Sequence, residues 1–482
     1  MFKNIKKQIA LIFCTSLLVV SCLEDEGNYV YTEVDEITFE GVEESYSIAR
    51  YDDFKVTPDL KHTKDSNNYT YKWFIDDGGY DSEIIAETKD LDIENLDWAP
   101  GKHDIYYVVT DEDTEIEYEY RFTVEVLNPF YEGWLVLSEE NGGSRLDMIS
   151  YLFEEYTVKN DVLSIANSEL ELSGVPESLM IYQWDRRVLG IYITTSGNGT
   201  VRLTPNTFET FRTLSSEFAS DQPDDLKADN LVSPYPNYGY AAANGNIYHW
   251  FSVWHIRYNQ PINIIDGTPF VASPYIVKGA PFSTTGYDDT NKRFVRFSGF
   301  RASSGLMAPE ASTLFDYDTG KDLIYMTQSK YNGTRAFAFL KDPVDSKHYL
   351  AIFSPNKYTQ YHYGEITATD FDQATSYAVS PDFGYIFYAV GGKVYQYDFT
   401  QDKTTLMIDR PEEVTYLKFN EFNKSNDRYD LLSSQLVVCT HNGSANGGVV
   451  EFYDVPPVNG QITLESSYSG FGKIKGIGYR DR

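Results

Sequence analysis

Residues 117–126 read EYEYRFTVEV, a strict alternation of polar residues with aromatic or apolar ones. Successive side chains of a β-strand point to opposite faces, so the apolar half of this stretch would share one face. The pattern predicts a strand with one buried and one solvated face. Aromatic residues make up 16% of the 482-residue chain, and such residues favour strands. No long run shows the apolar period of a helix. We therefore expect an all-β protein.

The stretch ends a segment, residues 28–128, that we expect to form a small β-sandwich. Turn-forming residues divide this segment, such as Asp76-Asp77-Gly78-Gly79 and Pro100-Gly101. Asn128-Pro129 provides a domain boundary, because proline cannot donate to a strand ladder. The other strands are expected at Ile37–Phe39, Tyr69–Ile75 and His103–Thr110.

Residues 129–482 show a different pattern, in which short apolar runs recur about every fifty residues. This spacing is typical of propeller blades, so we expect a β-propeller-like domain of about seven blades, with six or eight still open. A second set of β-sandwiches is the alternative. Lys473–Tyr479 could supply a strand that closes the ring and protects the sheet edges. The expected blade strands are Trp134–Leu137, Val188–Ile193, Asn246–Phe251, Lys292–Phe297, His348–Phe353, Tyr385–Val390 and Gln435–Val438.

The first residues have the features of an export signal. Three lysines precede an apolar stretch from Ile9 to Val20, which is too short to span a bilayer as a helix. We expect residues 1–21 to be removed as a signal peptide. The end of this segment, Val19-Val20-Ser21-Cys22, resembles the lipobox of bacterial lipoproteins. The resemblance implies that Cys22 carries lipid; the alternative is an ordinary secretory signal.

Residues 22–27 would then form a lipidated acidic linker. Leu23-Glu24-Asp25-Glu26 resembles the surface-export signal of Bacteroidetes-type lipoproteins. The resemblance implies an outer-membrane, lipid-anchored protein that faces the cell surface. A plain solvated linker, with the protein facing the periplasm, is the alternative.

The formal charge of the chain is −32, and it becomes −35 without the three lysines of the signal segment. A surface this acidic repels nucleic acids and other polyanions. Neutral glycans, peptides and partner proteins remain as ligands. Of the three cysteines, only Cys439 lies beyond the lipobox. Its apolar neighbours predict a buried small hydrophobic residue and not a nucleophile.

Two patterns in the sandwich segment resemble PKD-like domains. They are Tyr69-Thr70-Tyr71-Lys72-Trp73-Phe74 with the following Asp76-Asp77-Gly78, and Leu96–Asp111. The resemblance implies that Trp73 packs between two sheets of a spacer or adhesion module. Together with the lipobox, it makes the chain similar to PKD-like family lipoproteins that accompany SusC/SusD-type outer-membrane uptake systems. That likeness implies a SusC/SusD-type transporter complex as partner.

No recognised catalytic motif occurs. The chain has no G-x-S-x-G elbow, P-loop or H-E-x-x-H helix, and its seven histidines are dispersed. Adjacent carboxylates such as Asp288-Asp289 are expected in solvated turns. Asp316–Asp322 resembles half of a calcium loop, although a hairpin turn is favoured. We assign no catalytic residue, no metal site and no cofactor.

An aromatic segment is the candidate ligand site. If the strand at residues 246–251 continued, Trp250 and Trp254 would lie on one face and could stack on a sugar ring or a peptide side chain. Tyr235, Tyr238 and Tyr258 flank them and complete the candidate set. The competing interpretation is that these rings pack between neighbouring blades.

These observations predict a non-enzymatic accessory lipoprotein of the outer membrane. It would bind a peptide or neutral glycan, or dock on a SusC/SusD-type nutrient importer. A propeller glycan hydrolase or lyase is the alternative, and it would require convergent catalytic groups in a central funnel.

Overall fold

The computed structural model describes residues 35–63, 68–76, 82–183, 189–234, 237–279, 284–298, 301–308, 313–422 and 424–481. The protein is all-β, as the sequence predicts. It divides into two compact units, unit 1 (residues 1–127) and unit 2 (residues 128–482). Across the described residues, no helix is long and apolar enough to cross a membrane.

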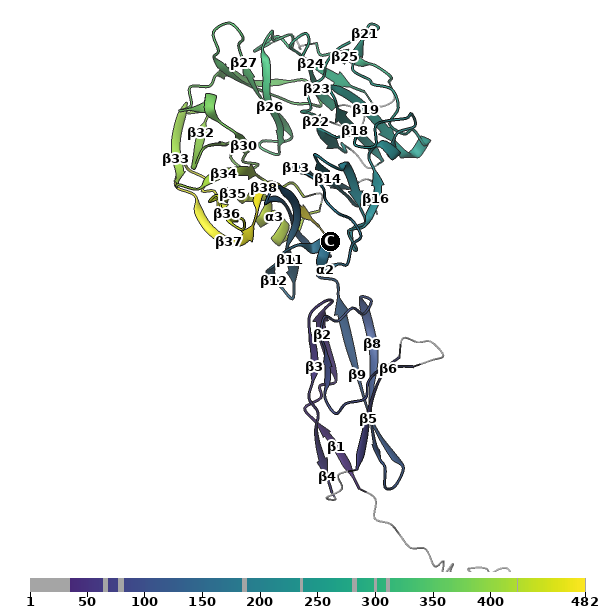
Figure 1. Ribbon diagram of the computed structural model, residues 1–482. Helices are drawn as coiled ribbons and strands as arrows, with labels where there is room; N and C mark the ends of the chain where they lie inside the picture. The colour runs from purple at the N-terminus through teal and green to yellow at the C-terminus, as the bar shows by residue number, and fades with distance from the viewer. Residues whose placement is uncertain are drawn as a thin grey trace, which may run out of the picture. The chain divides into compact units, whose positions relative to one another are not determined.

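Unit 1 is a sandwich built around a five-stranded sheet in the order β2-β9-β8-β5-β6 (Figure 1). Strands β2 and β9 pair in parallel, and the other pairs of this sheet are antiparallel. Two short pairs, β1-β4 and β3-β7, supply the second layer. The strands are β1 (Ile37–Glu40), β2 (Ser45–Ala49), β3 (Phe54–Val56), β4 (Asp59–His62), β5 (Tyr69–Asp76), β6 (Glu83–Ala86), β7 (Leu91–Ile93), β8 (Gly101–Asp111) and β9 (Ile116–Leu127).

The core of unit 1 is aromatic. Trp73 is fully buried, and its indole stacks on Tyr107 with ring centroids 4.0 Å apart. The indole Nε1 donates a hydrogen bond of 2.8 Å to the carbonyl of Thr88, so its one polar atom is satisfied. Phe54 and Leu91, from the short strand pair β3-β7, belong to the same hydrophobic cluster. This position between the layers confirms the role expected for Trp73.

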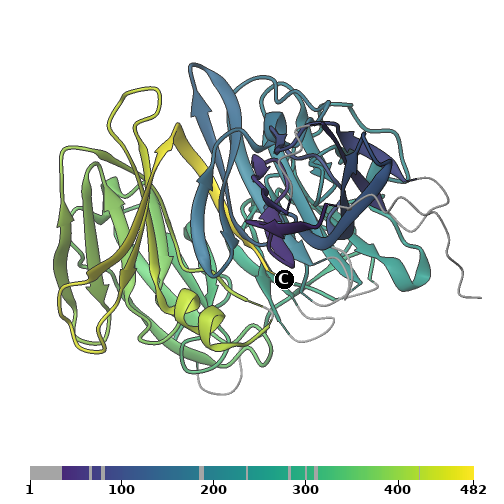
Figure 2. The same cartoon turned by 90° about the horizontal axis from the view of Figure 1, so that it is seen from below.

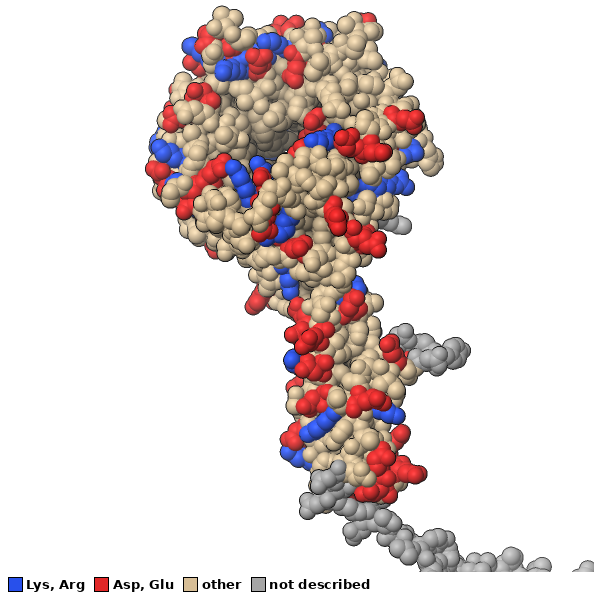
Figure 3. All heavy atoms as spheres, in the orientation of Figure 1, with Lys and Arg blue, Asp and Glu red and all other residues tan. Residues whose placement is uncertain are grey.

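The predicted alternation of buried and solvent-facing residues along β9 is also confirmed. From Phe122 to Val126 every second residue is buried, and the residues between them are not. Figure 3 shows that Asp and Glu side chains predominate on the viewed face of unit 1.

Unit 2 contains seven larger sheets among its described residues, named S1 to S7 here, and a two-stranded pair, β20-β21. In S1 the strands pair in the order β12-β11-β10-β38. Within each of S2 to S7 the strands pair in the order in which they follow one another along the chain. S1 holds β10 (Gly133–Glu140), β11 (Gly143–Leu152), β12 (Glu155–Lys159) and β38 (Lys473–Arg480). S2 holds β13 (Pro176–Gln183), β14 (Leu189–Thr195), β15 (Gly199–Leu203) and β16 (Thr210–Thr213). S3 holds β17 (Asn230–Val232), β18 (Tyr238–Ala243) and β19 (Asn246–Phe251).

The remaining sheets follow the same meander. After β20 (Ile264–Ile265) and β21 (Thr268–Pro269), S4 holds β22 (Val277–Lys278), β23 (Thr284–Asp288), β24 (Arg293–Phe297) and β25 (Ser304–Leu306). S5 holds β26 (Asp322–Ser329), β27 (Arg335–Lys341), β28 (His348–Phe353) and β29 (Gln360–Glu365). S6 holds β30 (Ser376–Val379), β31 (Ile386–Val390), β32 (Lys393–Asp398) and β33 (Lys403–Asp409). S7 holds β34 (Glu413–Lys418), β35 (Leu436–His441), β36 (Gly448–Asp454) and β37 (Thr463–Phe471).

Hydrophobic contacts join each sheet of unit 2 to the next. Six buried clusters span the successive interfaces from S2-S3 to S7-S1. At S1-S2 the backbone of β38 lies directly against β13. A Cβ on Gly476 would come within 2.9 Å of Leu179, so only glycine fits there without a shift. Each large apolar side chain buried in such interfaces contributes roughly 1.5–3 kcal/mol.

The last strand of the chain pairs with the first strand of unit 2. Strand β38 is antiparallel to β10, with Trp134 opposite Tyr479. Lys473–Tyr479 therefore forms a strand that pairs with the first strand of unit 2. A tight turn at Gly391-Gly392 joins β31 to β32, with Gly391 at φ 58° between the paired residues Val390 and Lys393. The arrangement of sheets is propeller-like (Figure 1).

The predicted blade strands all coincide with strands of S1 to S7, although Val188 lies outside the described residues. Among the described residues, two short α-helices accompany the strands. Helix α2 spans Val162–Ile165, and α3 spans Asp427–Ser434. Figure 2 shows α3 outside the sheets of unit 2. The side chain of Asn426 caps α3 by accepting a 2.8 Å hydrogen bond from the amide of Tyr429.

Candidate functional site

A cavity of about 180 Å³ lies among S5, S6 and S7, and we refer to it as the inner cavity. It is lined by β26, β30 and β34, each the first strand of its sheet, and by the segment that follows β34. These strands lie toward the middle of unit 2 in Figure 1, where Figure 3 shows a hollow on the viewed face. A hydrogen bond of 2.9 Å from the amide of Leu417 to the hydroxyl of Ser376 links β34 to β30.

Tyrosines dominate the apolar side of the inner cavity. The rings of Tyr325 and Tyr377 stack with centroids 5.3 Å apart, and Tyr275 packs edge-on against Tyr325 at 5.2 Å. Tyr416 lines the same space from β34. Burial raises the pKa of Tyr377 to about 12 and raises the pKa values of Tyr325 and Tyr416 as well. These phenols therefore stay protonated near neutral pH, as hydrogen-bonding groups on apolar rings.

Lys418 is a half-buried cation that lines the inner cavity. Its Nζ donates a 3.0 Å hydrogen bond to the carbonyl of Ile477 on β38. Burial lowers the pKa of Lys418 to about 8, while the charge of Glu421 opposes this shift and that of Lys278 adds to it. At neutral pH the amine is still mostly protonated, but its pKa lies nearer neutrality than that of an exposed lysine. A lysine in this state can donate to a polar ligand or, when neutral, accept a proton.

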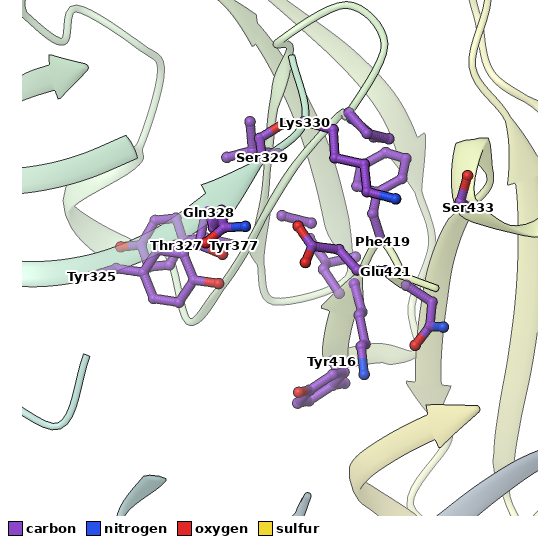
Figure 4. Close-up of a pocket in the computed structure, with 16 residues that line it drawn as sticks. Tyr325, Thr327, Gln328, Ser329, Lys330, Tyr377, Tyr416, Phe419, Glu421 and Ser433 are labelled. Carbon is purple, nitrogen blue, oxygen red and sulfur yellow. The ribbon is translucent and has the colours of Figure 1, made fainter. Parts of the chain in front are cut away.

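The polar side of the inner cavity carries amides, hydroxyls and one carboxylate. Figure 4 shows Gln328 beside the rings of Tyr325 and Tyr377, with the carboxylate of Glu421 turned toward them. Among the described lining residues, Glu421 is the single acid. In the part of the chain that the structure describes, no group of three or more His, Cys, Asp or Glu side chains is placed to hold a metal ion.

The residues predicted from the sequence to form a ligand site do not form one site in the structure: some are exposed, and others are buried in hydrophobic clusters. Strand β19 ends at Phe251, and a 3₁₀ turn over Ser252–Trp254 follows, so Trp250 and Trp254 do not share a strand face. The side chain of Trp254 is 60% exposed. Trp250 is half-buried and packs against the hydrophobic cluster between S2 and S3.

The flanking tyrosines are core residues where they are described. Tyr258 is fully buried in the same S2-S3 cluster, which matches the alternative of packing between neighbouring sheets. Tyr238 is buried against Phe251 of its own sheet S3, with ring centroids 4.2 Å apart and tilted planes. Tyr235 and the lipid-attachment residue Cys22 lie outside the described residues. Cys439 is buried, as expected, and burial raises the pKa of its thiol.

The inner cavity was not found from sequence, for a physical reason. The seven predicted blade strands are second or third in their sheets, where buried apolar residues are concentrated. The first strands border the cavity and mix tyrosine with Thr327, Gln328 and Lys418. Short segments that mix polar and aromatic residues in this way look like loops when only one sequence is read. The signal that could have found them is a tyrosine in the strand that precedes each apolar run, as at Tyr325, Tyr377 and Tyr416.

The comparisons with known proteins indicate the fold of the N-terminal domain and show no function. The model of the family described as PKD-like family matches residues 22–176. The N-terminal domain is therefore PKD-like. No curated protein matches the chain.

Two solved structures are similar to this chain at low sequence identity. A quinonprotein alcohol dehydrogenase-like protein from Bacteroides thetaiotaomicron is 10% identical, with 91% of this chain and 97% of that chain covered and a TM-score of 0.47. TolB from Acinetobacter baumannii is 13% identical, with 65% of this chain and 78% of that chain covered and a TM-score of 0.31. Similarity at this level carries no information about activity.

Proposed function

We propose that this protein is a lipid-anchored outer-membrane protein that binds a small neutral ligand in the inner cavity and serves a SusC/SusD-type importer. In this proposal S1 to S7 form a closed seven-bladed propeller. The observation that carries the binding role is the tyrosine-lined cavity, with Lys418 among its lining residues. Aromatic faces with a few convergent polar groups are the usual composition of a small-molecule site.

The size and chemistry of the inner cavity favour one sugar ring or one peptide side chain. At a share of about 30 Å³ per water molecule, its volume of about 180 Å³ holds only a few waters. Tyr325 and Tyr377 offer stacked rings on one side, and Gln328 offers both an amide donor and an acceptor. A hydroxyl-rich or amide-rich neutral ligand satisfies both sides at once.

The anchoring part of the proposal is supported by the sequence alone. Cys22 ends a lipobox-like segment and precedes an acidic linker. Two or more acyl chains on one terminus hold a protein stably at a membrane, whereas one chain binds marginally.

Binding can be measured by titration calorimetry of the mature protein with neutral oligosaccharides and with short peptides. We expect saturable binding by one of these classes, and a loss of about tenfold or more in Tyr377→Ala and Lys418→Met. Trp254→Ala is the control, because Trp254 is exposed and does not line the inner cavity. Equal loss in all three variants, or no binding to either class, would refute the inner cavity as the site.

Anchoring and location can be tested with Cys22→Ala in the full-length chain. The parent protein should incorporate a labelled fatty acid, sediment with outer membranes and react with antibody on intact cells. The variant should lose the label. Antibody access only after cell lysis would contradict the outward orientation. Purification of the parent without any SusC/SusD-type protein would contradict a stable complex.

A lyase is the second candidate, and Lys418 is the observation that favours it. A lysine whose pKa lies near 8 is suited to act as a general base, and the neighbouring Tyr416 phenol could supply a proton. A two-carboxylate hydrolase is less well supported, because it needs a pair of acids across the cleft. Release of unsaturated sugar products, abolished in Lys418→Met, would establish the lyase. Binding without product formation would favour the non-enzymatic role.

A further inference from the structure

A second cavity, of about 240 Å³, lies where S2 meets S3 and shares no described lining residue with the inner cavity. We refer to it as the arginine cavity. Arg202 reaches it from β15 and Arg212 from β16, the edge strand of S2. Trp250 reaches it from β19 of S3, and Arg257 follows the 3₁₀ turn after that strand.

One of the three arginines already has a carboxylate partner. Arg202 lies 3.6 Å from Glu217, which is 6% exposed. The hydroxyl of Tyr192 donates to both oxygens of this carboxylate, at 3.0 and 3.1 Å. Burial raises the pKa of Glu217, and Arg202 opposes that shift. Glu217 also lines the arginine cavity, where Arg202 and the hydroxyl of Tyr192 hold its carboxylate.

The other two arginines are placed without an ion-pair partner. In the ranges that the structure describes, no carboxylate lies within 4 Å of Arg212 or Arg257. The Arg212 guanidinium lies 5.3 Å from the centroid of the Phe211 ring. Arg257 donates to the backbone carbonyls of Ser216 and Glu217, which hold its side chain against the cavity.

Polar and aromatic groups complete the arginine cavity. Trp250 offers a half-buried indole, and the hydroxyl of Ser252 and the ring of His255 lie on the same lining. Arginine is the side chain best suited to bind a carboxylate through two parallel hydrogen bonds. An aromatic ring beside such an anion site suits a ligand whose charged group is attached to a ring.

We propose that the arginine cavity binds a small sugar acid. Arg212 and Arg257 bind its carboxylate, and Trp250 supports the face of its ring, with Ser252 and His255 as partners for hydroxyl groups. This site is independent of the neutral ligand proposed for the inner cavity. The acidic surface of the whole chain repels long polyanions but leaves a local positive cavity for a single carboxylate.

The test is titration of the full mature protein with glucuronate, glucose and acetate. Glucuronate should bind saturably, and its affinity should fall as ionic strength rises, because the contact is between charges. Arg212→Gln and Arg257→Gln should each weaken glucuronate binding by about tenfold or more. Both side chains are exposed, so neither substitution should change the melting transition.

Two controls separate the possible outcomes. Arg335→Gln removes an arginine elsewhere in unit 2 that packs on Tyr361, and it should leave glucuronate binding unchanged. Lys418→Met should also leave glucuronate binding unchanged, because Lys418 lines the inner cavity only. Failure of the arginine-cavity proposal can therefore be distinguished from failure of the inner-cavity proposal. Glucose or acetate binding as tightly as glucuronate, absence of saturable glucuronate binding, or equal loss in Arg335→Gln would each overturn the sugar-acid site.

Discussion

Trp73 shows how one side chain organises unit 1. Its ring fills the space between the layers, stacks on Tyr107 and satisfies its only polar atom at Thr88. Removal of so large a buried ring leaves a cavity that the surrounding strands can only partly refill. The carbonyl of Thr88 would also lose its donor.

Trp73→Ala should therefore lower the free energy of unfolding of unit 1 by about 3–5 kcal/mol. The measurement is hydrogen exchange in urea, followed at strands β8 and β9. Ile84→Ala is the matched control, because Ile84 lies on the same sheet but is 48% exposed. It should change the free energy by less than about 0.5 kcal/mol. Equal effects of the two substitutions would contradict the assigned core.

His362 links the stability of unit 2 to pH. It lies on β29 with its ring 4.9 Å from that of Phe399, and burial lowers its pKa below the ordinary value of 6.5. Between the lowered folded-state pKa and 6.5, the unfolded chain binds more protons than the folded one. The free energy of unfolding therefore falls as pH decreases below about 6.5.

We expect thermal unfolding from about pH 7.5 to about pH 5.5 to show a smaller loss of stability in His362→Gln than in the parent chain. His255→Gln is the control, because His255 is exposed on a turn and its replacement removes a histidine without disturbing the packing around His362. Identical pH profiles for the parent and His362→Gln would show that this histidine does not contribute.

At the level of elements, helix α3 is held to S1 by a buried carboxylate. Glu132, 4% exposed, accepts hydrogen bonds from Tyr429 at 2.7 Å and Tyr479 at 3.0 Å. It also pairs with Arg428, whose guanidinium packs over the ring of Tyr151. The network thus joins a short helix to the strand pair β10-β38.

Glu132→Ala should cost about 3 kcal/mol, because it leaves Arg428 and two hydroxyls without their shared acceptor. Thermal unfolding of the full chain measures the cost. Glu177→Ala is the comparison, since the 2.6 Å pair of Glu177 with Lys227 joins two side chains that are more than a third exposed. That pair should contribute less than about 1 kcal/mol. A cost at Glu132 no larger than at Glu177 would contradict the anchoring role.

At the level of the whole molecule, the two units have separate cores. Among the described residues, each hydrophobic cluster draws its members from one unit only. Unit 2 also contains both strands of its terminal pair, β10 and β38. A core of this size suffices for independent folding.

A fragment of residues 128–482 should therefore fold alone. Its near-ultraviolet circular dichroism should show fixed aromatic packing, and its melting temperature should lie within about 2 °C of the matching transition of the full chain. Removal of residues 473–482 from the same fragment provides the control, because it leaves β10 without a partner on one side. A fragment that lacks a cooperative transition would show that unit 2 depends on unit 1.

Local sequence patterns were enough to predict the β-class, the four longer segments assigned to the sandwich, the burial of Trp73 and Cys439 and one apolar strand in each of S1 to S7. These features depend on local alternation, on turn residues or on apolar runs, and all three are visible in neighbouring residues. Which polar residues meet depends instead on the packing of distant segments. Tyr325, Tyr377 and Lys418 come from three sheets, and Arg212 and Trp250 come from two. A cavity is formed by packing between distant segments, so spacing along the chain does not reveal it. The same packing ends β19 at Phe251 and separates Trp250 from Trp254.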